Sequence, residues 1–193
     1  MPIARKYQIN WLPDNYYHIY NRGAHKVPIF REEQNYVFVL SRTKQYLRKF
    51  DVAMIAYCLL PIHYHFLVRQ QGDYPAGLIP QRIFNSYSKA YNRRYEHSGT
   101  LFEGRYQAVH VVKESHLRQL CRYIHANPLK HGVVDDLEKW PYSNYLEWIG
   151  LRPGELVDHE FVDTFFPNRS DYREFVDDYL TLNQVPEELT YLT

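Results

Sequence analysis

Residues 52–69 read VAMIAYCLLPIHYHFLVR, two apolar runs that are separated by a proline. The first run, 52–60, is almost continuously apolar, and the second resumes after Pro61 and covers 63–69. Short apolar runs that are bounded by a turn residue are typical of buried strands. The stretch therefore predicts a tight hairpin of two buried strands, with the motif His63-Tyr64-His65 at the start of the second strand.

Regular elements are predicted on both sides of this hairpin. Apolar periodicity and capping residues indicate a strand and a helix before it, and a helix, a strand and a last helix after it. The predicted order is therefore strand, helix, strand, strand, helix, strand, helix. The flanking elements are expected at 16–22, 32–49, 81–95 and 106–112, followed by a helix that Ser115 caps and Pro128 stops.

This order matches the ferredoxin-like split unit, a four-stranded antiparallel sheet with helices on one face. We therefore predict an α+β fold, with short helices added near the C-terminus at 142–149, 160–165 and 169–182. Residues 1–150 would form the main domain, and residues 151–193 would form a helical extension that packs on the same domain. A chain of 193 residues can bury such a core without disulfides.

The charge pattern points to a polyanionic ligand. The formal net charge is only +1, but lysine and arginine dominate residues 89–105, whereas aspartate and glutamate are frequent in residues 155–188. The chain contains 19 tyrosines, and aromatic rings among basic side chains can stack on unpaired bases, although most tyrosines are expected to be half-buried packing residues. The uneven distribution, more than the net charge, favours a polyanion as the partner.

The cysteines and the N-terminal residues predict the compartment. Cys58 and Cys121 are too few and too isolated for a disulfide framework or a cysteine-rich zinc site, which fits a reducing cytosol. The N-terminal residues lack the apolar core of a signal peptide, and no apolar run approaches membrane-spanning length. We expect a cytoplasmic protein with no membrane partner. Since no glycine-containing segment forms a phosphate loop, we expect no nucleotide cofactor.

Two histidines and a tyrosine–asparagine pair are candidates for a chemical site. Side chains alternate along a strand, so His63 and His65 would point to one face and form half of a metal site. Tyr123 and Asn127 are one helical turn apart, roughly 40° around the helix axis, and so share a face. From the residues alone, the histidines could instead be a chance or structural pair, and Asn127 a helix-end residue.

Four blocks of sequence, in this order, resemble the signature blocks of a known family. They read YHIYNRG at 17–23, AYCLLPIHYHFLV at 56–68, YNRRY through GTLFEGRY at 91–106, and RYIHANPLKHG at 122–132. Together they are much more specific than any one block. The resemblance is to the REP-associated tyrosine transposases, which are single-tyrosine transposases of the HUH type, and it covers about residues 16–150.

The resemblance implies the parts of a catalytic site. His63 and His65 would be the two HUH metal ligands, and Tyr123 would be the nucleophile. Asn127 matches the polar position of the third ligand, one turn after the tyrosine. The cofactor would be Mg²⁺ or Mn²⁺, for which an amide oxygen is a suitable hard ligand.

The chain departs from the family pattern at a few positions. Ile62 stands where relatives often have asparagine before the first histidine, and Tyr64 stands where they often have an aliphatic residue between the histidines. Neither change removes a catalytic group. His125 often corresponds to an acidic or other polar residue in relatives, and no catalytic role is assigned to it.

The resemblance also implies a reaction and a substrate. Tyr123 would attack a phosphate beside the hairpin of a repeated extragenic palindrome, which gives a 5′-phosphotyrosine and a free 3′-OH, and attack by another 3′-OH would rejoin the strand. Arginine-rich segments around such a site favour single-stranded and hairpin DNA, which would associate the protein with the nucleoid. The side chains expected to contact the DNA backbone are Arg22, Lys26, Lys89, Arg93, Arg94, Arg105 and Lys130.

Several alternatives remain. A catalytically silent or domesticated descendant would bind hairpin DNA as a regulator. A rolling-circle initiator or a relaxase would share the HUH chemistry, but relaxases usually place the tyrosine before the histidines. A zinc hydrolase would need a further ligand at recognisable spacing, which the sequence lacks. The protein could be a monomer or a homodimer, because shorter relatives exchange the tyrosine helix, whereas residues after 150 could cover the sheet edge or the site.

Overall fold

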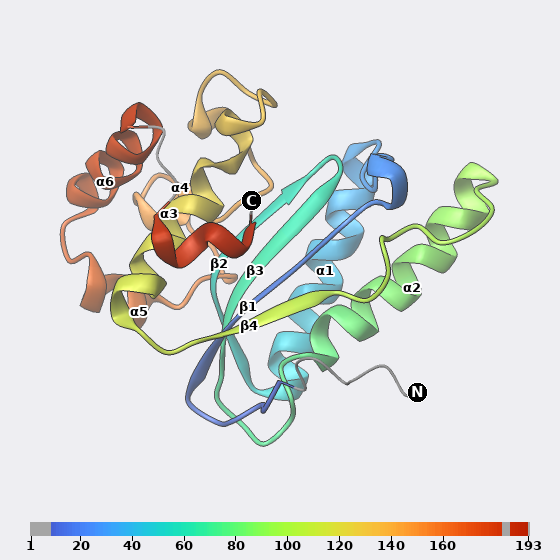
Figure 1. Cartoon of the computed structure of the whole chain (residues 1–193), viewed down its shortest axis with the longest axis horizontal. Helices are drawn as coiled ribbons and strands as arrows, with labels where there is room; N and C mark the ends of the chain where they lie inside the picture. The colour runs from blue at the N-terminus through green and yellow to red at the C-terminus, as the bar shows by residue number, and fades with distance from the viewer. Residues whose placement is uncertain (1–8, 183–185, 193) are drawn as a thin grey trace.

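The computed structural model describes residues 9–182 and 186–192 and is built around a four-stranded antiparallel sheet in the order β2-β3-β1-β4 (Figure 1). This order and the predicted sequence of elements confirm the ferredoxin-like α+β fold. None of the described helices is both long and apolar enough to cross a membrane. The elements are β1 (Asn15–Arg22), η1 (Ala24–Lys26), α1 (Glu33–Phe50), β2 (Val52–Leu60), β3 (His63–Gln70), α2 (Leu78–Tyr95), β4 (Gln107–Val111), α3 (Glu114–Lys130), η2 (Leu137–Lys139), α4 (Tyr145–Trp148), α5 (His159–Phe165), α6 (Arg169–Leu182) and η3 (Glu187–Leu192).

The β2–β3 hairpin has the predicted bounds to within one residue. Leu60 pairs with His63 across a two-residue connection, and β3 continues as a central strand between β2 and β1. On its other side, β3 pairs with β1 so that Tyr20 lies opposite His65. Residues that are directly opposite in an antiparallel pair share a face, so this register fixes which side chains accompany the two histidines.

Helices cover both faces of the sheet. The α1–α2 pair covers the face of Tyr64, whose ring stacks on that of Phe84 with centroids 4.1 Å apart. The prediction of helices on one face holds for these two, whereas α3 and the C-terminal helices lie on the opposite face (Figure 1). The continuous apolar run of β2 accounts for this arrangement, because a strand without polar alternation has to be covered on both faces.

Three predicted helix ends are wrong, two of them because of a proline. The last main helix, α3, begins at Glu114 after Lys113, so Ser115 is not its cap, and it runs through Pro128 to Lys130. A proline this close to the C-terminus removes one hydrogen bond, and the backbone N–H of Val133 donates to the Pro128 carbonyl (2.8 Å) to close the end. Helix α2 begins three residues early, because a proline is tolerated in a first turn whose N–H groups lack helical partners.

The outer edge of β2 is covered by the chain between Trp140 and Asp158. The backbone N–H of Leu59 donates to the Tyr142 carbonyl (2.9 Å), and that of Asp158 donates to the Met54 carbonyl (2.9 Å). The helix predicted at 142–149 is therefore reduced to α4, because the residues before it follow the strand edge. A covered edge has few unpaired backbone N–H and C=O groups to which the strand of a second chain could bind.

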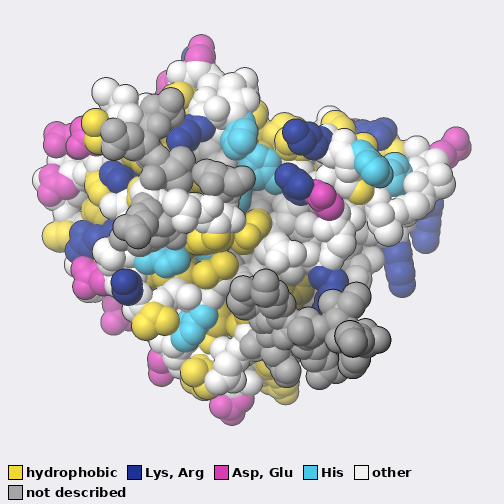
Figure 2. All heavy atoms as spheres, viewed as in Figure 1, with side chains coloured by type: hydrophobic (Ala, Val, Ile, Leu, Met, Phe, Trp, Pro, Cys, Tyr) yellow, Lys and Arg dark blue, Asp and Glu magenta, His cyan; other side chains and the backbone are white. Residues whose placement is uncertain are grey.

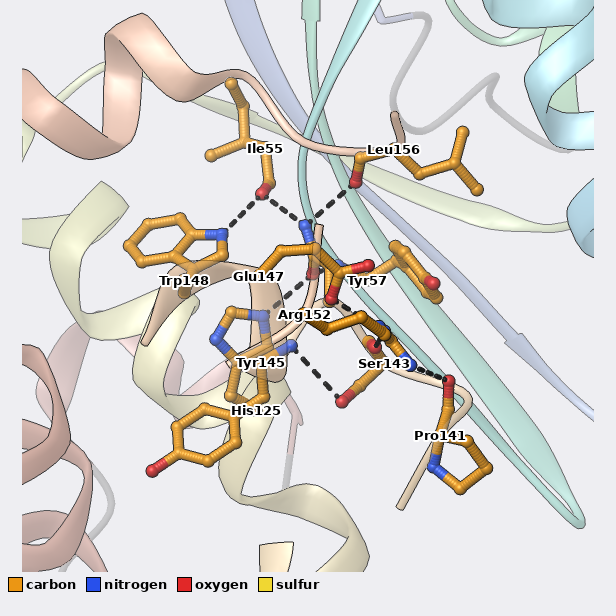
Figure 3. A network of polar contacts seen from close by, with 11 residues as sticks. Ile55, Tyr57, His125, Pro141, Ser143, Tyr145, Glu147, Trp148, Arg152 and Leu156 are labelled. Carbon is orange, nitrogen blue, oxygen red and sulfur yellow. Dashed lines mark hydrogen bonds and ion pairs between the residues drawn. The ribbon is translucent and has the colours of Figure 1, made fainter. Parts of the chain in front are cut away.

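The Asn144 side chain is the centre of this cover, and Figure 3 shows its partners Ile55, Tyr57, His125 and Leu156. Its Oδ1 accepts from the backbone N–H of Tyr57 (2.8 Å) and from His125 Nε2 (2.8 Å). Its Nδ2 donates to the carbonyl oxygens of Ile55 (2.8 Å) and Leu156 (3.1 Å). Because Asn144 is fully buried and uses its whole amide, it fixes β2, α3 and the following loop relative to one another.

His125 extends the network from α3 to α6. Since Asn144 Oδ1 can only accept, His125 carries its proton on Nε2, and its Nδ1 accepts from the hydroxyl of Tyr172. Complete burial lowers the pKa of His125 to about 4, so the ring is neutral at pH 7. His125 therefore holds α3 in place from the side that faces away from solvent.

Removal of the Asn144 amide should destabilise the protein strongly. Asn144→Ala would leave buried backbone groups of β2 and the covering loop without partners, so we expect the free energy of unfolding to fall by about 3 kcal/mol or more in chemical denaturation. The matched control is Asn85→Ala on the exposed side of α2, with an expected change within about 0.5 kcal/mol. Equal effects of the two substitutions would contradict the role given to Asn144.

Candidate active site

A cavity of about 650 Å³ lies on the α3 side of the sheet, beside the tip of the β2–β3 hairpin. Residues of β1, β3, α3 and η3 line it, together with the loop before β4. Its lining includes Tyr20, Arg22, Lys26, His63, His65, Glu103, Tyr123, His131 and Tyr191. It therefore brings together segments from almost the whole length of the chain.

His63 and His65 enter the cavity from β3. Their ring centroids are 5.2 Å apart with nearly perpendicular planes, and the intervening Tyr64 is buried on the opposite face of the sheet. His65 is only 4% exposed, whereas His63 is half-buried and nearer the opening. The alternation of strand side chains thus places both imidazoles on one face, as predicted.

Helix α3 brings Tyr123 and Asn127 to the same place. The Tyr123 ring meets His65 edge-on, with centroids 5.5 Å apart, and Asn127 Oδ1 is 3.4 Å from His63 Nε2. Asn127 Nδ2 donates to the Tyr123 carbonyl (2.6 Å), which leaves Oδ1 directed at the histidine. All four of the predicted catalytic and ligand residues are therefore close together, and Asn127 is a buried residue inside α3.

The donor atoms fit a divalent cation. Two ligands at about 2.1 Å from an octahedral ion, at right angles, are about 3 Å apart, so the observed 3.4 Å would need only a small adjustment. Imidazole nitrogen and amide oxygen are both ligands of Mn²⁺ and related ions. Within residues 9–182 and 186–192, no three His, Cys, Asp or Glu side chains are grouped to hold a metal. The Asn127 oxygen is a further donor beside this pair of histidines.

Burial sets the protonation states in the cavity. It lowers the pKa of His63 to about 4, helped by nearby His131, and lowers the pKa of His65 well below its usual value. Both rings are therefore neutral at pH 7, the form that can bind a metal. Burial raises the pKa of Tyr123 to about 12, with Tyr179 adding to the effect. The phenol is thus protonated at neutral pH, and a positive charge close to its oxygen would favour the phenolate.

Four of the seven basic side chains that were predicted to contact DNA lie near this end of the sheet. Arg22 and Lys26 line the cavity, and Arg22 forms an ion pair with Glu103. Arg105 lines a second cavity of about 430 Å³, whose other walls include Tyr64 and residues of α2. Lys130 donates to the Tyr179 hydroxyl (3.1 Å) at the end of α3. Figure 2 shows histidine and basic side chains gathered on this face, near the tip of the hairpin.

The other three predicted contacts lie elsewhere. Lys89, Arg93 and Arg94 are on α2, which covers the opposite face of the sheet, and Arg94 pairs with Glu32 (2.5 Å). The structure therefore does not bring them to the cavity. Their clustering in the sequence reflects the solvent-facing side of a helix, which is the usual place for such a run of charges.

Several residues in or directly behind the cavity were not predicted from the sequence. His18 and Tyr20 alternate on β1 just as His63 and His65 do on β3, so the same period-two argument would have found them. Glu103 lies in a segment rich in lysine and arginine, so the charge pattern did not single it out. Tyr191 reaches the cavity from the C-terminal η3, and no local pattern predicts that contact.

Comparison with known proteins identifies the family of the chain. The model of the family described as IS200-like transposases matches residues 12–127, a range that contains the two histidines, the tyrosine and the asparagine. A Haemophilus influenzae protein named as a REP-associated tyrosine transposase is 28% identical over 116 residues, which cover 54% of this chain and 65% of the relative. The match thus spans a little less than two thirds of that relative.

A solved structure shares the fold. The structure of a REP-associated tyrosine transposase bound to a REP hairpin superposes with a TM-score of 0.65 at 18% identity, and the match covers 80% of this chain and 94% of that chain. The family model spans more than half of the chain and includes His63, His65, Tyr123 and Asn127. The resemblance of the four sequence blocks is thereby confirmed, and the chain belongs to the IS200-like transposase family.

Proposed function

We propose that the protein is a metal-dependent tyrosine strand transferase, which cleaves and rejoins one strand of hairpin DNA. The observation that carries this proposal is the convergence of His63, His65 and Tyr123 on one cavity from a strand and a facing helix. The buried Asn127 Oδ1 lies beside them, 3.4 Å from His63 Nε2. A neutral imidazole pair beside an amide oxygen and a phenol is a set of groups suited to phosphoryl transfer.

Each group has a role in the proposed reaction. The imidazoles of His63 and His65 and the amide of Asn127 would hold Mg²⁺ or Mn²⁺, which would polarise the scissile phosphate. Tyr123 Oη forms a bond to phosphorus while the bond to the 3′ oxygen breaks. The phenol proton passes to solvent, and the leaving 3′ oxygen takes up a proton. The product is a 5′-phosphotyrosine, whose ester bond a second 3′-OH can attack, so no nucleotide cofactor is needed.

The substrate is proposed from the charge and shape of the cavity together with the relatives. Arg22 and Lys26 provide positive charge at its rim, and aromatic rings such as Tyr20 line its wall, a combination that suits single-stranded DNA. The solved relative is bound to a REP hairpin, and we propose the same class of hairpin here. Because one chain supplies the whole site, we propose that a monomer is sufficient for cleavage, in the cytoplasm at the nucleoid.

Covalent trapping tests the nucleophile. We expect a 3′-labelled hairpin strand to form a denaturation-resistant adduct with the protein in Mn²⁺, no adduct in EDTA, and none with Tyr123→Phe, because that variant lacks the attacking oxygen. Tyr74→Phe changes an exposed tyrosine and should leave the adduct unchanged. An adduct with Tyr123→Phe would refute the assignment. Tight binding without any adduct in the wild type would instead favour the silent hairpin-binding regulator.

A metal titration tests the third ligand. Asn127→Leu keeps the size of the side chain but removes its oxygen, so the Mn²⁺ concentration that gives half-maximal adduct should rise at least about tenfold. Asn127→Asp retains an oxygen and should need less metal than the leucine variant. Asn85→Leu on α2 serves as the control. An unchanged midpoint in Asn127→Leu would exclude Asn127 as a ligand.

Binding at several salt concentrations tests the two groups of basic residues. The double variant Arg22→Ala with Lys26→Ala should weaken binding of the hairpin and reduce the salt dependence by about two counterions, because two phosphate contacts are lost. Lys89→Ala with Arg93→Ala removes the same charge from α2 and should change binding much less. Fluorescence anisotropy from low to high salt gives both slopes. A larger loss of binding in the α2 double variant than in the Arg22 and Lys26 double variant would place the DNA on the α2 face.

A further inference from the structure

His18 lies behind His65 on the neighbouring strand and is completely buried. Its Nε2 is 2.9 Å from His65 Nδ1, and its Nδ1 is 2.9 Å from the hydroxyl of Tyr191. Its ring also stacks on Tyr20, with centroids 4.8 Å apart. A row of three side chains, Tyr191, His18 and His65, therefore leads from the C-terminal η3 to the candidate metal site.

The position of the protons in this row follows from the chemistry of a ligand histidine. His65 uses Nδ1 for the contact with His18, so only its Nε2 can face the cavity with a free lone pair. That lone pair is available only when the proton is on Nδ1, which then donates to His18 Nε2. His18 in turn must carry its own proton on Nδ1, where the Tyr191 hydroxyl oxygen can accept it.

We propose that His18 is a positioning residue that holds His65 in the tautomer and ring orientation required of a metal ligand. The inference rests on the proposed function, because it gives His65 the role of a ligand. Histidine ligands usually donate their second N–H to a carboxylate, a carbonyl or water. Here the acceptor is a second, fully buried imidazole, which contributes no charge and is held by stacking on Tyr20 and by Tyr191.

Matched substitutions separate positioning from packing. His18→Leu fills the buried space without an acceptor, whereas His18→Gln can place its amide oxygen close to the position of Nε2. We expect His18→Leu to weaken Mn²⁺ binding by the DNA-free protein by about 10–100-fold, and His18→Gln to restore most of this loss. His110→Leu is the control, because His110 is on the opposite face of the sheet and pairs with Asn15 (2.6 Å). Electron paramagnetic resonance of free Mn²⁺ gives the affinities.

A second measurement on the unmodified protein does not depend on how the variants fold. Nitrogen-15 NMR of the metal-free protein should show the His65 proton on Nδ1, and a proton on Nε2 would overturn the inference. Equal Mn²⁺ affinity of wild type and His18→Leu would also overturn it while leaving the proposed function intact. If the wild type binds no Mn²⁺, the proposed metal site fails, and the role of His18 fails with it.

Discussion

The register of β3 is the constraint on which the candidate site depends. Strand side chains alternate, so a shift of one residue would bury His63 and His65 under α2 and expose Tyr64 in the cavity. The register is fixed on one side by β2, through a two-residue connection, and on the other by β1. The stacking of Tyr64 on Phe84 makes the alternative unfavourable, because the apolar face already has its partner. The pairing of β3 with its neighbouring strands thus determines both the packing of the core and the geometry of the site.

The nucleophile helix is fixed by a different part of the chain. His125 lies between Tyr123 and Asn127 on α3 and is held by Asn144, which at the same time caps the outer edge of β2. The cover of β2 therefore has two effects. It provides partners for backbone groups at the edge of β2, and it holds α3, which carries Tyr123, against the sheet. Since α3 contributes both Tyr123 and Asn127, a small rotation of this helix would separate the asparagine oxygen from His63.

The sequence predicts the parts of this structure that rest on local pattern. The βαββαβ order, the hairpin and the shared face of His63 and His65 follow from periodicity, and the four blocks identify the family. The helix ends near prolines were predicted wrongly. The general tendency of proline to end a helix does not show that later residues can supply the hydrogen bonds at that end, as Val133 does for Pro128. Asn144, Glu103 and Tyr191 could not be found, since their roles arise from contacts between residues distant in sequence. Likewise, the basic run at 89–105 is continuous in sequence, but Lys89, Arg93 and Arg94 lie on α2, whereas Arg105 lies in the loop before β4.

The central claim is that β3 and α3 together form one metal-binding site next to Tyr123. A crystal structure of the protein with Mn²⁺ and a hairpin strand, with anomalous data collected for manganese, tests it most directly. The account predicts one anomalous peak within about 2.3 Å of His63 Nε2, His65 Nε2 and Asn127 Oδ1, with the Tyr123 hydroxyl facing the bound phosphate. A peak that lacks these three ligands, or DNA bound along α2 with the cavity empty, would contradict it.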